Sequence, residues 1–177
     1  MRKMILLAAA AAAIVALPAA AMTPGQANCP ARVAPADLGA KLVNEMMTYQ
    51  EGQETNAALT QAIKQVNDAC VAREKVPGAQ QDTYTRYVIA RLSHDELVRQ
   101  FAGMKVPVAV LERVFEIGPG KRNPTPDQVT EAQYNTLVTE LSKAGVSVDK
   151  LPDGALGMMG AYITVSSEMY RDQAMMR

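Results

Sequence analysis

The sequence has no tryptophan, one histidine and two cysteines, and aromatic residues make up only 5% of its 177 positions. So few histidines and cysteines cannot build a Cys/His zinc cluster, and no C-x-x-C-H motif for attached haem occurs. Lysine plus arginine equals aspartate plus glutamate at 18 each, so no positive excess points to a polyanion. The sequence therefore predicts no metal, no cofactor and no nucleic-acid partner. Its 49% hydrophobic content is sufficient for a core.

The first 21 residues have the pattern of a secretory signal peptide. Two positive residues precede an uncharged run from Met4 to Ala21, and Pro18 breaks the run just before three alanines. This pattern favours removal of residues 1–21 by cleavage after Ala21. A membrane anchor is the alternative, because the run approaches the length that spans a bilayer, but its alanine-rich composition and Pro18 favour the signal. We therefore expect a periplasmic or secreted protein of the bacterial envelope, without a stable membrane span after cleavage.

Export changes the interpretation of the two cysteines, because disulfides form and persist in oxidising compartments. Cys29 and Cys70 allow a single pairing, and we expect them to form a disulfide that closes a loop of about 42 residues, worth roughly 4 kcal/mol. Two unpaired thiols are one alternative. A redox-active pair is another, although the C-x-x-C spacing typical of such pairs is missing.

Removing the leader leaves 156 residues, the size of one domain. Residues 22–36 hold several prolines and are predicted to be an N-terminal coil arm. Residues 37–177 are predicted to form one helical domain.

Within that domain, apolar residues recur at helical spacing and no strand pattern of useful length occurs. Asp37 is expected to cap a helix that continues to Tyr49, and Ser93 to restart the helical phase through a capping box. Gly145 is expected to provide a left-handed C-cap. The predicted fold is all-α, a single compact bundle of six or seven short helices. The expected segments are 38–49, 55–73, 84–92, 93–103, 107–115, 125–145 and 154 onward.

Two motifs contain some residues of a hydrolase triad or a phosphate-binding loop but lack the required arrangement. Ser93, His94 and Asp95 are successive residues on a predicted helix, so their side chains point about 100° apart and cannot form a hydrolase triad with one another. The loop Gly118–Arg122 lacks the upstream glycine, the Ser or Thr after the lysine, and the preceding strand of a phosphate-binding loop. Lys121 and Arg122 are instead candidates for contact with an acidic partner.

The last predicted helix is rich in methionine and glycine. Met158 and Met159 follow core spacing, but flexible methionines also suit adaptable partner surfaces, and thioethers can bind Cu(I). No Met-x-x-Met cluster with histidine is present, which disfavours copper. Met158 and Met159 are therefore candidates for a partner surface.

The stretch Gly154–Gly160 (GALGMMG) is similar to the G-A-x-G-L-M-Q stretch of goose-lysozyme-type lytic transglycosylases, which are helical and exported. In that family a glutamate directly before a serine, just over ten residues upstream, is the catalytic acid, and Glu140 is the nearest candidate. Leu141 separates Glu140 from the following serine, and Gly160 takes the position of the family's glutamine. The resemblance implies cleavage of cell-wall glycan with Glu140 as the general acid.

Two functions follow as hypotheses. The leading one is an exported, non-catalytic helical protein that binds another envelope protein as a chaperone-like, adaptor or inhibitor module. The alternative is a small glycan-cleaving enzyme that uses Glu140.

Overall fold

The computed structural model describes residues 22–54 and 56–176, and these form seven α-helices without strands, which confirms the predicted all-α bundle. The predicted signal peptide, residues 1–21, lies outside the described residues. Three short 3₁₀ turns, at Gly78–Gln80, Pro126–Gln128 and Val148–Lys150, join some of the helices. The α-helices are α1 (Pro24–Val33), α2 (Leu38–Thr48), α3 (Ala57–Glu74), α4 (Gln81–Gly103), α5 (Val108–Phe115), α6 (Glu131–Lys143) and α7 (Ala155–Met175).

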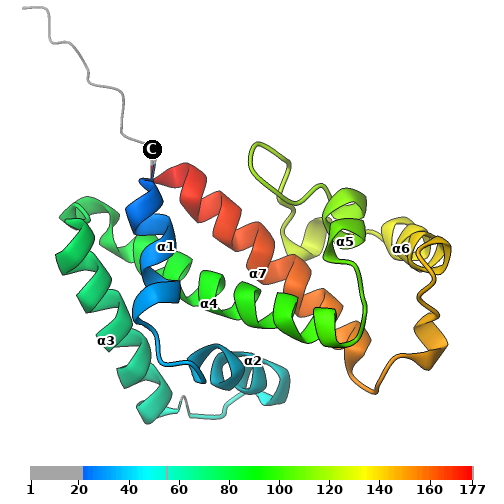
Figure 1. The fold of residues 1–177 in the computed structure, drawn as a ribbon, viewed down its shortest axis with the longest axis horizontal. Coiled ribbons are helices and arrows are strands. Elements are labelled where there is room, and N and C mark those ends of the chain that lie inside the picture. The colour runs from blue at the N-terminus through cyan, green and yellow to red at the C-terminus, as the bar shows by residue number, and fades with distance from the viewer. Residues whose placement is uncertain (1–21, 55, 177) are drawn as a thin grey trace, which may run out of the picture.

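The two longest helices, α4 and α7, pack along one another in antiparallel directions and form the centre of the molecule (Figure 1). Their apolar faces divide the core into two clusters. The first joins α1, α2 and α3 to the first half of α4 and the end of α7, and it contains Tyr84, Tyr87 and Met169. The second joins α5 and α6 to the end of α4 and the start of α7, around Phe101 and Tyr162. Each half of the central pair thus carries its own group of helices.

Helix α1 corrects the prediction of a coil arm over residues 22–36. Thr23 caps it through a capping box with Gln26, and Pro24 stands in its first turn. Pro30 lies inside the helix and has no N–H to donate to the carbonyl four residues earlier, on Gln26. The Tyr84 hydroxyl of α4 donates to that carbonyl at 2.9 Å. A donor from another helix therefore compensates for a proline that predicts a coil from sequence alone.

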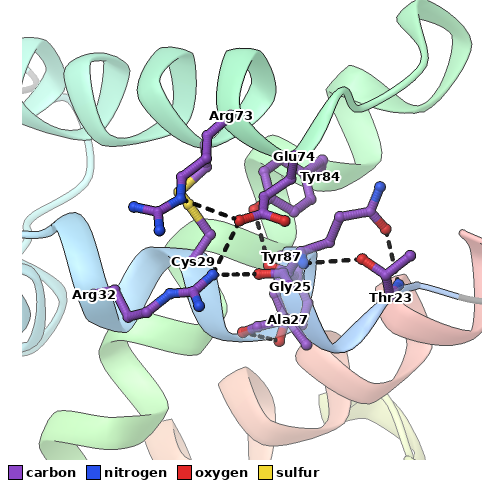
Figure 2. The surroundings of a disulfide bond; sticks show 11 residues. Thr23, Gly25, Ala27, Cys29, Arg32, Arg73, Glu74, Tyr84 and Tyr87 are labelled. Atoms are coloured by element: carbon purple, nitrogen blue, oxygen red, sulfur yellow. Dashed lines mark hydrogen bonds and ion pairs between the residues drawn. A yellow bond between two sulfur atoms is a disulfide. The ribbon is translucent and has the colours of Figure 1, made fainter.

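Further contacts fasten α1 to the bundle (Figure 2). The Tyr87 hydroxyl donates to the Ala27 carbonyl at 3.0 Å, and Arg32 pairs with Glu74 of α3 at 3.0 Å. The predicted disulfide is confirmed: Cys29 of α1 and Cys70 of α3 are bonded, 41 residues apart in sequence, and both are fully buried. The described structure contains no free cysteine.

Two of the predicted helix starts are wrong, and one predicted cap lacks its hydrogen bond. Ser93 does not begin a helix, because α4 continues through it and its side chain is buried. The box at Thr125 forms, but it starts a 3₁₀ turn, and Thr130 caps α6 instead. Asp37 does occupy the N-cap position of α2, but its side chain forms no capping hydrogen bond and instead pairs with Lys41 at 2.7 Å. Gly145 does adopt the expected left-handed conformation after α6, with φ of 81°.

None of the described helices combines the length and apolarity needed to cross a membrane.

Candidate functional site

An apolar groove with a volume of about 420 Å³ lies between α2, α3, α4 and α7. This volume falls in the range of roughly 300–1,000 Å³ that is typical of ligand sites. The surface that faces the groove is mostly apolar, although seven of its fifteen lining residues have polar or charged side chains. The lining residues are Leu42, Glu45, Met46, Tyr49, Asn56, Leu59, Thr60, Ile63, Arg86, Ile89, Ala90, Ser93, Thr164, Val165 and Glu168.

The floor of the groove is buried, whereas its rim on α2 is exposed. Leu42 and Val165 are each 7% exposed, and Ile63 and Ile89 are half-buried between floor and rim. Tyr49, at the end of α2, is 53% exposed. Because a helical face repeats after seven residues, Leu42 and Tyr49 lie on one stripe of α2. That stripe begins inside the core and continues past the point where the neighbouring helices cover it.

The exposed apolar surface continues from the groove towards the start of α7. Met46 and Met47, in the last turn of α2, are 37% and 39% exposed. The Met47 methyl group lies so close to α7 that a Cβ on Gly157 would approach it to 3.0 Å. The next residue towards the N-terminus, Leu156, is 59% exposed. The missing side chain at Gly157 therefore lets the end of α2 rest against α7, and it leaves several large apolar groups in contact with solvent.

Sequence analysis missed this surface. Met46, Met47 and Tyr49 occur at helical spacing in the segment predicted to be helical from Asp37 to Tyr49, but spacing alone does not mark them as exposed. The available signal was their place in the last turn of that helix, immediately before a polar loop that contains Gly52. Apolar residues at such an end have fewer neighbours to cover them.

Charge around the groove is unevenly compensated. The Arg86 guanidinium contacts the buried Asp172 carboxylate of α7 at 3.1 Å, so this cation already has a counter-ion. Burial raises the pKa of Asp172 above its ordinary value, although Arg86 acts in the opposite direction. The carboxylates of Glu45 and Glu168 also line the groove, and neither forms an ion pair with any residue of the described ranges. The groove therefore carries two uncompensated negative charges.

Glu140, the candidate general acid, lies on α6 and outside the groove. Its carboxylate accepts from Lys143 at 2.8 Å and pairs with Arg113 of α5 at 2.9 Å. The hydrogen bond and charge of Lys143, with a smaller contribution from Arg113, lower the pKa of Glu140. A glycosidase acid needs the opposite shift, because it must carry a proton near neutral pH. The surroundings of Glu140 therefore do not favour that role.

The other sequence-predicted site residues do not assemble into one site. Lys121 and Arg122 lie exposed on the loop after α5, where Arg122 pairs with Glu116 at 3.2 Å. Met159 is only 1% exposed, which corrects its prediction as part of a partner surface. Met158 is half-buried against the second core cluster. None of these four side chains lines the groove.

Ser93, His94 and Asp95 separate as their helical spacing predicts. Ser93 lines the groove, whereas the His94 ring lies against Tyr162, with 5.4 Å between ring centroids. His94 Nδ1 lies 3.1 Å from an Asp95 carboxylate oxygen, and its Nε2 is buried without a hydrogen-bond partner among the described residues. Burial opposes ionisation of Asp95, but hydrogen bonds from His94 and Arg91 lower its pKa overall. His94 and Asp95 therefore pair with one another, while Ser93 lines the groove.

No group of three or more His, Cys, Asp or Glu side chains in residues 22–54 and 56–176 is placed to hold a metal ion. Comparisons with protein-family models, with curated proteins and with solved structures gave no match to this chain.

Proposed function

We propose that this chain is an exported, non-catalytic binding protein of the cell envelope, and that the groove between α2, α3, α4 and α7 receives apolar side chains of a protein partner. The observation that carries the proposal is the groove itself, whose buried aliphatic floor opens onto the exposed Met46 and Tyr49. Apolar surface of this kind, rimmed by polar residues, marks interaction sites on folded proteins.

A protein partner fits better than a small molecule because the apolar surface extends beyond the groove. Met47 and Leu156 lie outside the lining and are still well exposed, so the partner would cover more than the cavity. Methionine side chains are flexible and polarizable, which lets them adapt to the shape of a partner. Interfaces also concentrate binding energy on buried aromatic and aliphatic anchors, which the groove could accommodate.

The leader-like residues 1–21 and the disulfide support the envelope location. A buried disulfide suits an oxidising compartment, where the bond persists without active maintenance. On this proposal, N-terminal sequencing of the protein from cells should begin at Met22. A start at Met1 in the cytosol would contradict the location.

Site-specific photo-crosslinking tests the binding function. A photoreactive residue at position 46 should capture a discrete protein partner in cells that make the full chain. The matched control is position 134 on α6, where Tyr134 is 44% exposed; α6 contributes no residue to the groove and lies at the opposite end of the bundle from α3 (Figure 1). Capture at position 46 that is lost when Ile89→Asp is added supports the proposal. Equal capture at both positions, or none at position 46, contradicts it.

A further inference from the structure

The charge pattern around the groove identifies the chemistry of its occupant. Glu45 on α2 and Glu168 on α7 both line the groove, so carboxylates stand on two of its four helices. Glu51 and Glu54 are exposed in the loop between α2 and α3, which begins and ends next to the lining residues Tyr49 and Asn56. None of the four acidic groups has a basic partner in the described part of the chain.

Positive charge at the groove is already neutralised. Arg86 is its only basic lining residue among those described, and it is held by two hydrogen bonds to Asp172, one from Nε at 3.3 Å and one from Nη2 at 3.1 Å. An anionic ligand would have to compete with this buried carboxylate and would also meet Glu45 and Glu168. A cation at the rim would meet two carboxylates that lack a counter-ion, with an apolar floor between them.

The fold also limits the form that the occupant can take. The described residues contain no strand, so no sheet edge is present on which an extended segment could pair its backbone. A helix satisfies its own backbone hydrogen bonds and can place apolar anchors three, four and seven residues apart into a groove between helices. Leu59, Ile63 and Ile89 provide aliphatic surface in the groove for such anchors.

We infer that the groove binds a cationic amphipathic α-helix of a partner protein, with its apolar stripe on the groove floor and its lysine or arginine residues at Glu45 and Glu168. This inference rests on the proposed binding function and names the class of partner. A second copy of the chain fits less well, because two copies that met through this same surface would each bring Glu45 and Glu168 to the contact. Like charges would then meet at the rim.

Model peptides test the inference with the disulfide-bonded chain that begins at Met22. The first probe is a fluorescein-labelled peptide of leucine and lysine in which leucine recurs at helical spacing. The second replaces every lysine by glutamate, and the third is a scrambled leucine–lysine peptide of the same composition. Fluorescence anisotropy should give an affinity for the first probe that is about tenfold or more above that for the other two, and this affinity should fall as salt is added.

Two charge variants separate a local effect from a general one. Glu45→Gln combined with Glu168→Gln should weaken binding of the leucine–lysine peptide by roughly threefold to tenfold, since rim charges contribute modestly. The matched control, Asp127→Asn with Asp153→Asn, removes the same charge from exposed positions outside the groove and should leave the affinity unchanged. Met46→Ser with Tyr49→Ser should weaken binding of the same peptide through lost apolar contact.

The outcomes distinguish the two proposals. Both the proposed binding function and this inference are overturned if neither helical peptide binds. They are also overturned if Met46→Ser with Tyr49→Ser leaves the peptide affinity unchanged. If the lysine and glutamate peptides bind equally well and depend on Met46 and Tyr49, the binding function stands and the charge inference is overturned. An equal effect of the groove and control charge variants also overturns the charge inference. Self-association of the chain that depends on Met46 and Tyr49 would show that a second copy is the occupant.

Discussion

Removing the bond between Cys29 and Cys70 should lower the free energy of unfolding by about 4 kcal/mol. The two cysteines are 41 residues apart, and the chain-entropy model gives about this value at 25 °C for a loop of that length. Stabilities of single domains are typically about 5–15 kcal/mol, so the bond would supply a large share of the total. Because Tyr84, Tyr87 and the Arg32–Glu74 pair also hold α1, the chain without the bond should still fold.

Equilibrium urea denaturation followed by circular dichroism measures the effect. The oxidised chain is compared with the same chain kept reduced throughout and with the double variant Cys29→Ala/Cys70→Ala. Reductant should shift the unfolding midpoint of the wild-type chain and leave the double variant unchanged, which controls for other effects of the reagent. In thermal denaturation the corresponding loss should be roughly 8–16 °C.

A result below about 1 kcal/mol would refute this reasoning, because the loop-closure term alone predicts about four times as much. It would mean that the reduced, unfolded chain already keeps α1 near α3, so that the bond restricts little. A variant that fails to fold would show instead that the hydrogen bonds and the ion pair of α1 cannot hold the helix without the bond.

Four other substitutions probe the packing and charge of the bundle. Tyr84→Phe should lower the free energy of unfolding by about 1–3 kcal/mol in urea denaturation, because it leaves a buried carbonyl of α1 without a donor. Gly39→Ala should also destabilise the chain, by about 1–3 kcal/mol, since its Cβ would lie 3.0 Å from a backbone oxygen of α4. A Cβ at Gly160 meets nothing within 4 Å, so Gly160→Ala should stabilise the chain by about 0.5–1 kcal/mol. The melting temperatures of the two variants should therefore move in opposite directions. Burial raises the pKa of Asp172 in the folded state, so its contribution to stability falls as pH rises above the ordinary value of 3.8. Asp172→Asn removes this dependence. Urea denaturation at several pH values should show the variant gaining stability relative to wild type as pH rises above 3.8. A stability difference that does not change with pH would contradict a raised pKa for Asp172.

Local rules predicted much of the fold. The apolar spacing of α3 and α7 follows the helical period, and the left-handed residue after α6 falls at Gly145, where glycine costs least. The cysteine pairing followed from having only two cysteines and from the signal-peptide pattern of residues 1–21. These features depend on nearby residues or on elimination, which is why the sequence reveals them.

Helix α1 could not be predicted in this way. Pro30 weakens a helix locally, and the group that compensates for it, the Tyr84 hydroxyl, is 58 residues away from the carbonyl on Gln26 that it satisfies. The misplaced boundary at Ser93 has a related cause. Its capping pattern is genuine in the sequence, but packing of α4 along α7 favours an uninterrupted helix.

The groove was beyond sequence analysis for a different reason. Helical spacing places Leu42 and Tyr49 on one face of α2, but it does not say where the neighbouring helix stops covering that face. The lining combines residues of four helices, from Leu42 to Glu168. Only the tertiary arrangement shows that the stripe on α2 ends above a cavity.

The two-part core gives the molecule an unequal resistance to local opening. The covalent bond secures only the group formed by α1 and α3, whereas α5 and α6 depend on side-chain packing around Phe101 and Tyr162. Backbone amides of α5 and α6 should therefore exchange with deuterated water sooner than those of α1 and α3. Of the helices that line the groove, α3 carries the bonded Cys70, and α2 and the first half of α4 pack in the same core cluster as α3. Helices α5 and α6 should therefore open transiently while the groove keeps its shape.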